Sequence, residues 1–254
     1  MTDIVISAKK PLLDARPLAH RVGLIALATD HTSEVDYARM LAPRGVGVYG
    51  TRIPYANPVT PATLRAMAPS LAEAAALILP DEGLDAVIYG CTSASVCIGE
   101  AAVAAAIRQG KPGVAVVTPI SATLAGLRAL GAKRISVLTP YSVETTRPMA
   151  ELFEAEGFAL ASVTCLGMDD DREMARIAPA SIIELAAEAA AKGSDALFIS
   201  CTAVRAAGVI AQIENVVNMP VLSSNYACAW QVLRLLGDQG AAAPGQMMQI
   251  GLAP

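Results

Sequence analysis

Two cysteines in the chain have the same kind of surroundings. In "DAVIYGCTSASVC" (85–97), an apolar run leads into Cys91, and the hydroxyl residues Thr92 and Ser93 follow. In "DALFISCTAV" (195–204), Asp-Ala again begins an apolar run, which ends at Cys201 and Thr202. An ionised thiol can attack carbon or carry a proton. Two thiols in matching settings therefore predict a pair that acts together.

The other three cysteines have no such context. We interpret Cys97, Cys165 and Cys228 as buried small hydrophobic residues, which is the common role of a free cysteine. The chain has no C-x-x-C spacing, and His20 and His31 are not placed for a zinc site. We therefore expect neither a metal nor an organic cofactor.

The elements that must position the two cysteines follow from the pattern of apolar runs. Strand-length apolar runs alternate with helix-length segments along the chain, which is typical of parallel sheets with helices on both faces. The expected strands are 21–29, 46–53, 85–90, 113–118, 134–139, 159–165, 195–200 and 220–224.

The series of elements occurs twice. Leu24 and Ile135 are 111 residues apart, and Cys91 and Cys201 are 110 apart. We predict an α/β fold of two doubly wound domains, each with a parallel four-stranded sheet, related by a pseudo-twofold axis. The domains would be 21–131 with Cys91 and 132–254 with Cys201, after an N-terminal extension of residues 1–20, with the active-site cleft between them.

The strand ends are where chemistry is expected. Ligands of open parallel sheets bind outside the carboxyl ends of the strands. Each cysteine would precede a helix, whose first N–H groups bind an anion and favour the thiolate. Two such sulfurs facing one another could move a proton at a carbon beside a carboxylate, or add to an activated double bond and protonate it.

The segments "GCTSAS", "LTPYSVET", "SCTAV", "GMDDDREMARI" and "PVLSSN" resemble the aspartate/glutamate racemase superfamily from about Arg21 to Gly237. The chain is most similar to the branch with maleate cis-trans isomerase, arylmalonate decarboxylase and ectoine-utilisation homologues. This resemblance implies a cofactor-independent isomerase in which Cys91 is the nucleophile or base and Cys201 the acid on the opposite face. It also implies contacts to a small carboxylate or dicarboxylate from Thr29, Asp30, Thr92, Ser93, Thr118, Tyr141, Thr202 and Ala203.

The chain departs from the pattern of maleate isomerases at three positions where they have asparagine: Asp30, Thr146 and Asp171. Two added carboxylates would repel a dianion, since charges about 4 Å apart interact by roughly 4 kcal/mol at an effective dielectric constant near 20. An amine or a monocarboxylate would suit Asp30 better. Asp30 could instead only cap the following helix, and we interpret Asn225 as a cap.

Other functions remain open at this point. An amino-acid racemase working by two-base proton transfer is the main alternative, followed by an arylmalonate-type decarboxylase or a non-catalytic carboxylate-binding protein. The net charge of −4 and the lack of a Lys/Arg cluster argue against nucleic acid or membrane partners. The first twenty residues have no signal-peptide pattern, so we expect a cytoplasmic protein, and a homodimer is expected from the resemblance.

Overall fold

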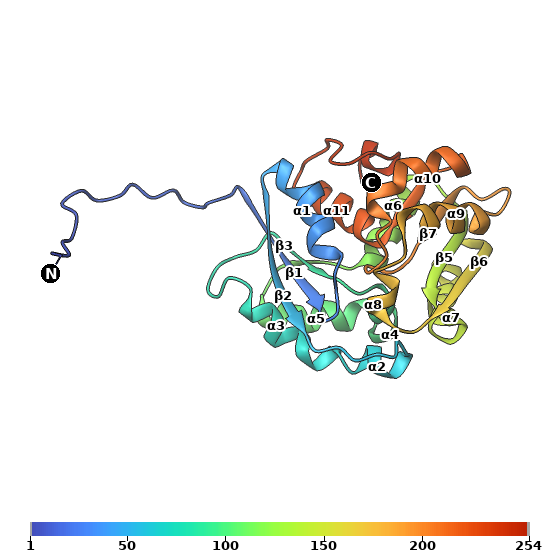
Figure 1. Ribbon diagram of the computed structural model, residues 1–254, viewed down its shortest axis with the longest axis horizontal. Coiled ribbons are helices and arrows are strands. Elements are labelled where there is room, and N and C mark those ends of the chain that lie inside the picture. The colour runs from blue at the N-terminus through green and yellow to red at the C-terminus, as the bar shows by residue number, and fades with distance from the viewer. Residues whose placement is uncertain (1, 253–254) are drawn as a thin grey trace.

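The computed structural model describes residues 2–252 and contains two parallel sheets (Figure 1). Each sheet has four strands, in the order β2-β1-β3-β4 in the first and β6-β5-β7-β8 in the second. The second order repeats the first with each strand number raised by four. The prediction of two doubly wound halves with four-stranded parallel sheets is therefore confirmed.

The first sheet is built from apolar strands that helices cover on both faces. Seven of the eight residues of β1 are buried, because a strand inside a parallel sheet meets helices on each side. The strands are β1 (His20–Leu27), β2 (Val46–Ile53), β3 (Ala86–Tyr89) and β4 (Ala115–Val117). The helices are α1 (Ser33–Leu41), η1 (Ala42–Arg44), α2 (Pro61–Arg65), η2 (Ala68–Ser70), α3 (Leu71–Leu77), α4 (Thr92–Ile98), α5 (Glu100–Gly110) and α6 (Pro119–Ala129).

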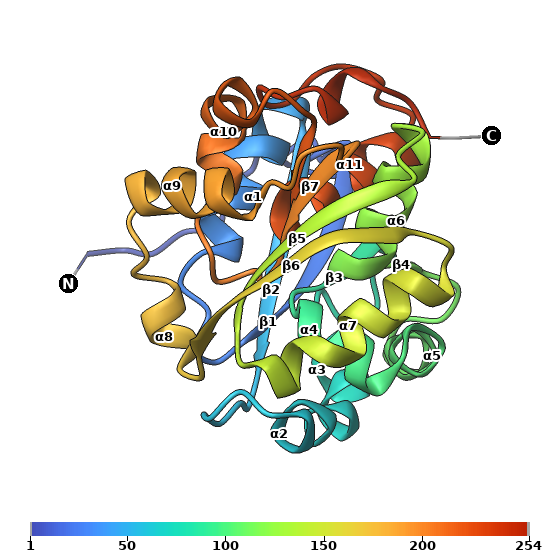
Figure 2. The ribbon, with the colours of Figure 1, turned by 90° about the vertical axis from the view of Figure 1, so that its right-hand side faces the viewer.

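The second sheet follows the same plan, and β5 and β6 cross the face of the molecule turned to the viewer in Figure 2. Its strands are β5 (Arg134–Tyr141), β6 (Ala159–Met168), β7 (Ala196–Ile199) and β8 (Val221–Ser223). Its helices are α7 (Val143–Ala155), α8 (Asp171–Met174), α9 (Pro179–Ala189), η3 (Ala207–Val209), α10 (Ile210–Val217), α11 (Ser224–Leu235) and η4 (Met247–Gln249).

The last helices of the two halves, α6 and α11, pack against each other where the halves meet. Gly126 of α6 lies so close to β8 that a methyl group there would approach Leu222 Cδ2 to 3.0 Å. Helix α11 in turn packs on α1 of the first half. The two halves thus share their final helices, and the division at residues 131 and 132 stays a prediction.

Three expected helices differ from those observed. The segment 60–79 forms α2, η2 and α3, because Pro69 removes an amide donor inside the run. The segment 93–108 is divided at Gly99, whose φ of 93° ends α4. The third helix was expected to start soon after Cys201, yet α10 begins only at Ile210. The two cysteine loops are therefore not copies of each other.

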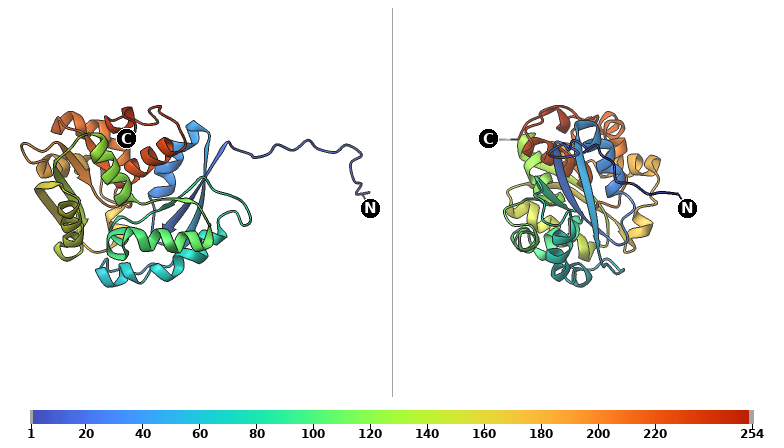
Figure 3. Two further views of the ribbon diagram at one scale, coloured as in Figure 1. Left: turned by 180° about the vertical axis from the view of Figure 1, so that it is seen from behind. Right: turned by 90° about the vertical axis from the view of Figure 1, so that its left-hand side faces the viewer.

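The two ends of the described chain differ in whether they pack against the rest of the molecule. Residues 2–19 run outward from the start of β1 (Figure 3), whereas the segment after α11 folds back onto that helix. Arg234 holds this segment by donating hydrogen bonds to the carbonyl groups of Asp238, Gly240, Met248 and Ile250. Met1, Ala253 and Pro254 lie outside the described residues. Within residues 2–252, no helix has the length and apolar character needed to cross a membrane.

Candidate active site

Cys91 and Cys201 both lie directly beyond the carboxyl end of a central strand. Cys91 follows β3 and is the N-cap of α4, with an extended backbone (φ −149°). Cys201 follows β7 and has a φ of 88°, which a side-chain-bearing residue rarely adopts. Such a conformation persists only where the surrounding structure enforces it, and it is concentrated at functional sites.

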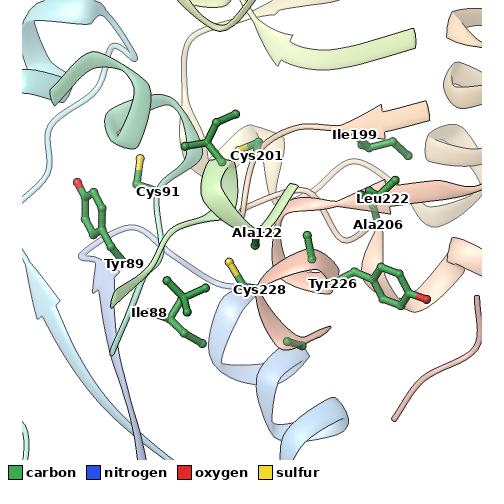
Figure 4. Packing of buried hydrophobic residues seen from close by; sticks show 14 of the residues in the cluster. Ile88, Tyr89, Cys91, Ala122, Ile199, Cys201, Ala206, Leu222, Tyr226 and Cys228 are labelled. Atoms are coloured by element: carbon green, nitrogen blue, oxygen red, sulfur yellow. The ribbon is translucent and has the colours of Figure 1, made fainter. Parts of the chain in front are cut away.

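The two cysteine loops touch each other. The hydroxyl of Thr202 donates a 3.0 Å hydrogen bond to the carbonyl of Gly90, so the residue after one cysteine is bonded to the residue before the other. Cys91 is 5% exposed and Cys201 is 4% exposed. Figure 4 shows both among buried residues where the two halves meet. An ionised Cys91 raises the pKa of Cys201, as expected of neighbouring thiols.

Each sulfur has donors of its own. Cys91 Sγ lies 3.8 Å from Ser93 Oγ, and the N–H of Ala94 lowers its pKa. The hydroxyl of Tyr141 and the N–H of Ala203 lower the pKa of Cys201. Ala203 therefore acts through its backbone, which a reading of side-chain types could not reveal.

Burial outweighs these donors at both sulfurs. Burial raises the pKa of Cys91 to about 12 and raises that of Cys201 further still, because a charge is costly away from water. The carboxylate of Asp171 adds to both upward shifts. The N–H at the start of α4 does favour the Cys91 thiolate, as expected of a helix N-terminus, but burial outweighs it, so the pKa of each thiol lies above its usual value.

Tyr141 connects the two cysteine loops. It ends β5 and is 2% exposed. Burial raises its pKa most, followed by the charges of Cys201 and Cys91, while a hydrogen bond with Ser93 lowers it. Its hydroxyl is thus protonated and lies beside Cys201 and Ser93, where it can donate to a carboxylate.

Asp30 is engaged in the structure of the chain. One of its oxygens accepts from the backbone N–H groups of Thr32 (2.7 Å) and Ser33 (2.9 Å), and the other accepts from the Ser33 hydroxyl (2.6 Å). Asp30 thus accepts from the N–H groups at the start of α1, whose N-cap residue is Thr32, and its contact with substrate stays a prediction. Its neighbour Thr29 donates a 2.7 Å hydrogen bond to Asp171.

The hydroxyls of three other candidates have partners within the protein. Thr92 shares a 2.7 Å hydrogen bond with Ser224 of α11, and Thr202 bonds Gly90 as described above. Thr118 caps α6 and bonds the carboxylate of Glu100. These contacts hold the loops in place, and the role of the three threonines in binding substrate stays a prediction.

Asn225 does not cap α11, so that interpretation is wrong. Its amide donates 2.9 Å hydrogen bonds to the carboxylate of Asp36 and to the carbonyl of Thr202. Its oxygen accepts from the hydroxyl of Tyr37 at 3.3 Å. Asn225 thus connects the Cys201 loop to α1. The sequence could not show this, because the contact depends on how α11 packs against α1.

The segment after β2 belongs to the site and was missed from the sequence. Burial raises the pKa of Tyr55 most, and the charges of Cys91, Asp171 and Cys201 raise it further, so this segment lies within the electrostatic reach of both thiols. The feature of the sequence that could have indicated Tyr55 is its position just beyond the carboxyl end of the expected strand 46–53. Asn57 fastens this segment to the second half, with its amide donating to Asp170 (2.8 Å) and its oxygen accepting from the N–H of Asp171 (3.2 Å).

Asp171 is the charged group that the sequence comparison singled out without placing it. It begins α8, is 7% exposed, and contacts Thr29 of the first half. Burial raises its pKa to about 6, so it is ionised at neutral pH. Among residues 2–252, no group of three or more His, Cys, Asp or Glu side chains is arranged to hold a metal ion.

The chain is similar to proteins of known activity. An arylmalonate decarboxylase from Bordetella bronchiseptica is 32% identical over 147 residues, which are 57% of this chain and 61% of that protein. A maleate isomerase from Nocardia farcinica is 29% identical over 237 residues, covering 89% of this chain and 93% of the isomerase.

A solved structure is similar over most of the fold. It is a cysteine-to-serine mutant of the Nocardia farcinica maleate cis-trans isomerase with a covalently bound succinylcysteine intermediate. It superimposes with a TM-score of 0.82 at 26% identity and covers 91% of this chain and 98% of its own. The resemblance to this branch of the racemase superfamily is confirmed. Because residues 58–248 also match the family model described as arylmalonate decarboxylase, the chain belongs to the arylmalonate decarboxylase family.

Proposed function

We propose that the protein is a cis-trans isomerase of a small unsaturated carboxylic acid, with Cys91 as the nucleophile and Cys201 as the proton donor. The observation that carries this proposal is the hydrogen bond between Thr202 and Gly90, which joins the loops of two buried cysteines. Thiols held on adjoining loops can act on one small molecule from two sides, as addition and protonation of a double bond require.

The reaction starts with Cys91 ionised, after its proton has passed to solvent. The Cys91 sulfur bonds one alkene carbon, and the π electron pair moves to the neighbouring carbon, which takes the proton of Cys201. The former double bond is now single and rotates. Cys201 then removes a proton, the C–S bond breaks with its electron pair returning to sulfur, and the trans acid leaves.

The surroundings of the two sulfurs support these roles. The Ala94 N–H and the Ser93 hydroxyl favour the thiolate that Cys91 must become. Tyr141 and the Ala203 N–H do so for the thiolate that protonation of the substrate leaves at Cys201. The covalent succinylcysteine in the Nocardia farcinica isomerase is the kind of adduct that this sequence of steps produces.

A second function is favoured by Asp171. A buried carboxylate next to the two thiols would suit a substrate with an ammonium group, as in an amino-acid racemase. In that reaction, one cysteine removes the α-proton while the other returns a proton from the opposite face. The two functions share the same residues but differ in substrate and product.

Proton NMR in deuterated buffer distinguishes the functions. The panel contains maleate, its monoamide, 2-aryl malonates and free amino acids. We expect a cis-unsaturated acid to convert to its trans isomer, and Cys91→Ser and Cys201→Ser each to lower kcat/KM by about a thousandfold or more. Cys165→Ser, on the half-buried edge strand β6, is the matched control and should retain full activity.

A covalent adduct provides an independent readout. In Cys201→Ser, the group that removes the proton before the C–S bond breaks is weakened, so a substrate-derived mass should accumulate on Cys91 and be located by peptide mass spectrometry. Deuterium entering the α-carbon of an amino acid would instead support the racemase, and release of CO₂ from a malonate would support a decarboxylase. Turnover that survives both cysteine substitutions would contradict every form of the proposal.

A further inference from the structure

Asp171 is an ionised carboxylate that has no ion-pair partner among residues 2–252. Its side chain is 7% exposed, and its Oδ2 accepts a 2.7 Å hydrogen bond from Thr29. Each ion pair found among residues 2–252 joins other groups, so neither lysine nor arginine neutralises Asp171 there. A carboxylate has about four acceptor positions. Thr29 uses one of them.

The charge of Asp171 acts on the reacting groups themselves. Asp171 begins α8, whose Met174 Sδ lies 4.0 Å from Cys201 Sγ, and its charge raises the pKa of Cys91, Cys201 and Tyr55. The charged groups that act on Asp171 in turn are Asp30 and Asp170, which raise its pKa, and His31, which lowers it. His31 is exposed, so solvent screens its contribution.

We propose that the substrate carries a single carboxylate and, at its other end, an N–H donor that binds Asp171. The donor is a carboxamide or an ammonium group. This inference rests on the proposed function, because it names the substrate class of the same two-cysteine site. A second carboxylate on the substrate would be repelled by the ionised Asp171, whereas an N–H group would donate a hydrogen bond to it.

Asp171 has more free acceptor positions than Asp30 does. Asp30 has both oxygens occupied by N–H and O–H donors at the start of α1. Asp171 retains acceptor capacity and is the one whose charge reaches the thiols. The donors Ser93 and Tyr141 lie near the same sulfurs and suit the remaining carboxylate of the substrate.

Binding of saturated ligands tests the inference without turnover, because they have no double bond to react. Calorimetry at pH 8 compares succinate with succinamate, its monoamide, and with β-alanine, which carries an ammonium group. We expect the wild-type protein to bind succinamate or β-alanine about a hundredfold more tightly than succinate. Whichever of the two binds tightly identifies the donor as an amide or an ammonium group.

Substitution of Asp171 assigns the preference to this residue. Asp171→Asn keeps the shape and can still accept from Thr29, so it should bind succinate better and lose most of the preference. Asp171→Glu keeps an acceptor and should retain part of the preference. Asp169→Asn removes the same charge two residues away on an exposed side chain and should bind as wild type does. The thermal unfolding midpoint of each variant is measured first.

Three results would overturn the inference. They are tighter binding of succinate than of both N–H ligands by wild type, an unchanged preference in Asp171→Asn, and no binding of any N–H ligand. Failure of the proposed function would look different. In that case, the binding preference would depend on Asp171 as expected, while the cis-unsaturated monoamide would show neither isomerisation nor an adduct on Cys91.

Discussion

At the scale of single residues, the two thiols are alike in burial and different in how they are held. Cys91 has an extended backbone and an adjacent serine, whereas Cys201 has a left-handed backbone and lies beside a tyrosine. A left-handed φ at a residue with a side chain stores strain of order 1 to 3 kcal/mol. Two hydrogen bonds hold the next residue, Thr202, and so keep the backbone of Cys201 in this conformation. The Thr202 hydroxyl donates to Gly90, and the Thr202 carbonyl accepts from Asn225.

Tyr141→Phe tests the donor beside Cys201. The ring keeps its packing, but Cys201 and the substrate lose a hydroxyl that favours the ionised sulfur. We expect kcat/KM to fall by about tenfold to a hundredfold with little loss of stability. The measurement is steady-state kinetics by NMR, with Tyr49→Phe on β2 as control. Equal rates for Tyr141→Phe and wild type would remove Tyr141 from the reaction.

At the scale of elements, α1 and α11 are connected by buried polar groups. Asn225 of α11 bonds both Asp36 of α1 and the Thr202 carbonyl beside Cys201. Buried polar groups are stable only when paired, so the approach of the two helices determines where the Cys201 loop lies. This link couples packing between the halves to the geometry of the site.

Asn225→Ala should weaken both the fold and the site. The variant leaves Asp36 and the Thr202 carbonyl without a donor, so we expect the free energy of unfolding to fall by about 2 to 4 kcal/mol. We also expect kcat to fall under conditions in which the protein is fully folded. Urea denaturation and kinetics are measured together. Asn215→Ala on the exposed face of α10 is the control and should change stability by less than about 0.5 kcal/mol.

Asp36 gives the protein a pH-dependent stability. Burial raises its pKa to about 6 from 3.8, against the lowering effect of Asn225 and Arg39. A raised pKa favours folding of the protonated form. The stability from this group is therefore present below about pH 4 and is lost as the pH rises through 6. At pH 8, the buried charge costs about 3 kcal/mol.

Asp36→Asn removes that charge. We expect the variant to be more stable than wild type at pH 8, with the difference shrinking by about 2 to 3 kcal/mol between pH 8 and pH 4. Urea denaturation at both values measures it, with the exposed Asp169→Asn as the reference. A difference independent of pH would show that folding does not raise the pKa of Asp36.

At the scale of the whole molecule, the site is closed by contacts between the halves. The segment 54–59 of the first half is held to residues 169–171 of the second by the two hydrogen bonds of Asn57 and by the Val59 N–H, which donates to the Asp169 carbonyl at 2.8 Å. Both thiols are buried, so a substrate reaches them only when part of the surrounding structure opens, and we expect this contact to be the part that opens.

Asn57→Ala should loosen that contact. We expect alkylation of Cys91 and Cys201 by iodoacetamide to quicken several-fold, because opening becomes more frequent, while global stability falls by only about 1 kcal/mol. Peptide mass spectrometry measures each rate, and Asn215→Ala is again the control. Unchanged alkylation would indicate that another segment limits access. The expected homodimer stays a prediction, which light scattering would test.

Local chemistry made part of the site predictable. Apolar runs that end in Cys-Thr marked Cys91 and Cys201, and the repeat of about 110 residues indicated the two sheets, because parallel strands require buried apolar faces. The helix expected directly after Cys201 was wrong, since the left-handed backbone at that residue turns the chain away from a helix. A side-chain pattern does not encode such a turn unless glycine marks it.

The amino-acid sequence by itself determined the fold class, the order of elements and the two cysteines, because these depend on periodicity and residue type. The tertiary structure alone decided that Asp30 accepts hydrogen bonds at the start of α1, that Asn225 holds the Cys201 loop, and that the charge of Asp171 raises the pKa of Tyr55 and of both thiols. Each of these depends on which distant groups meet and how far water is excluded around them. Those quantities are properties of the packed chain and determine both pKa values and hydrogen-bond partners.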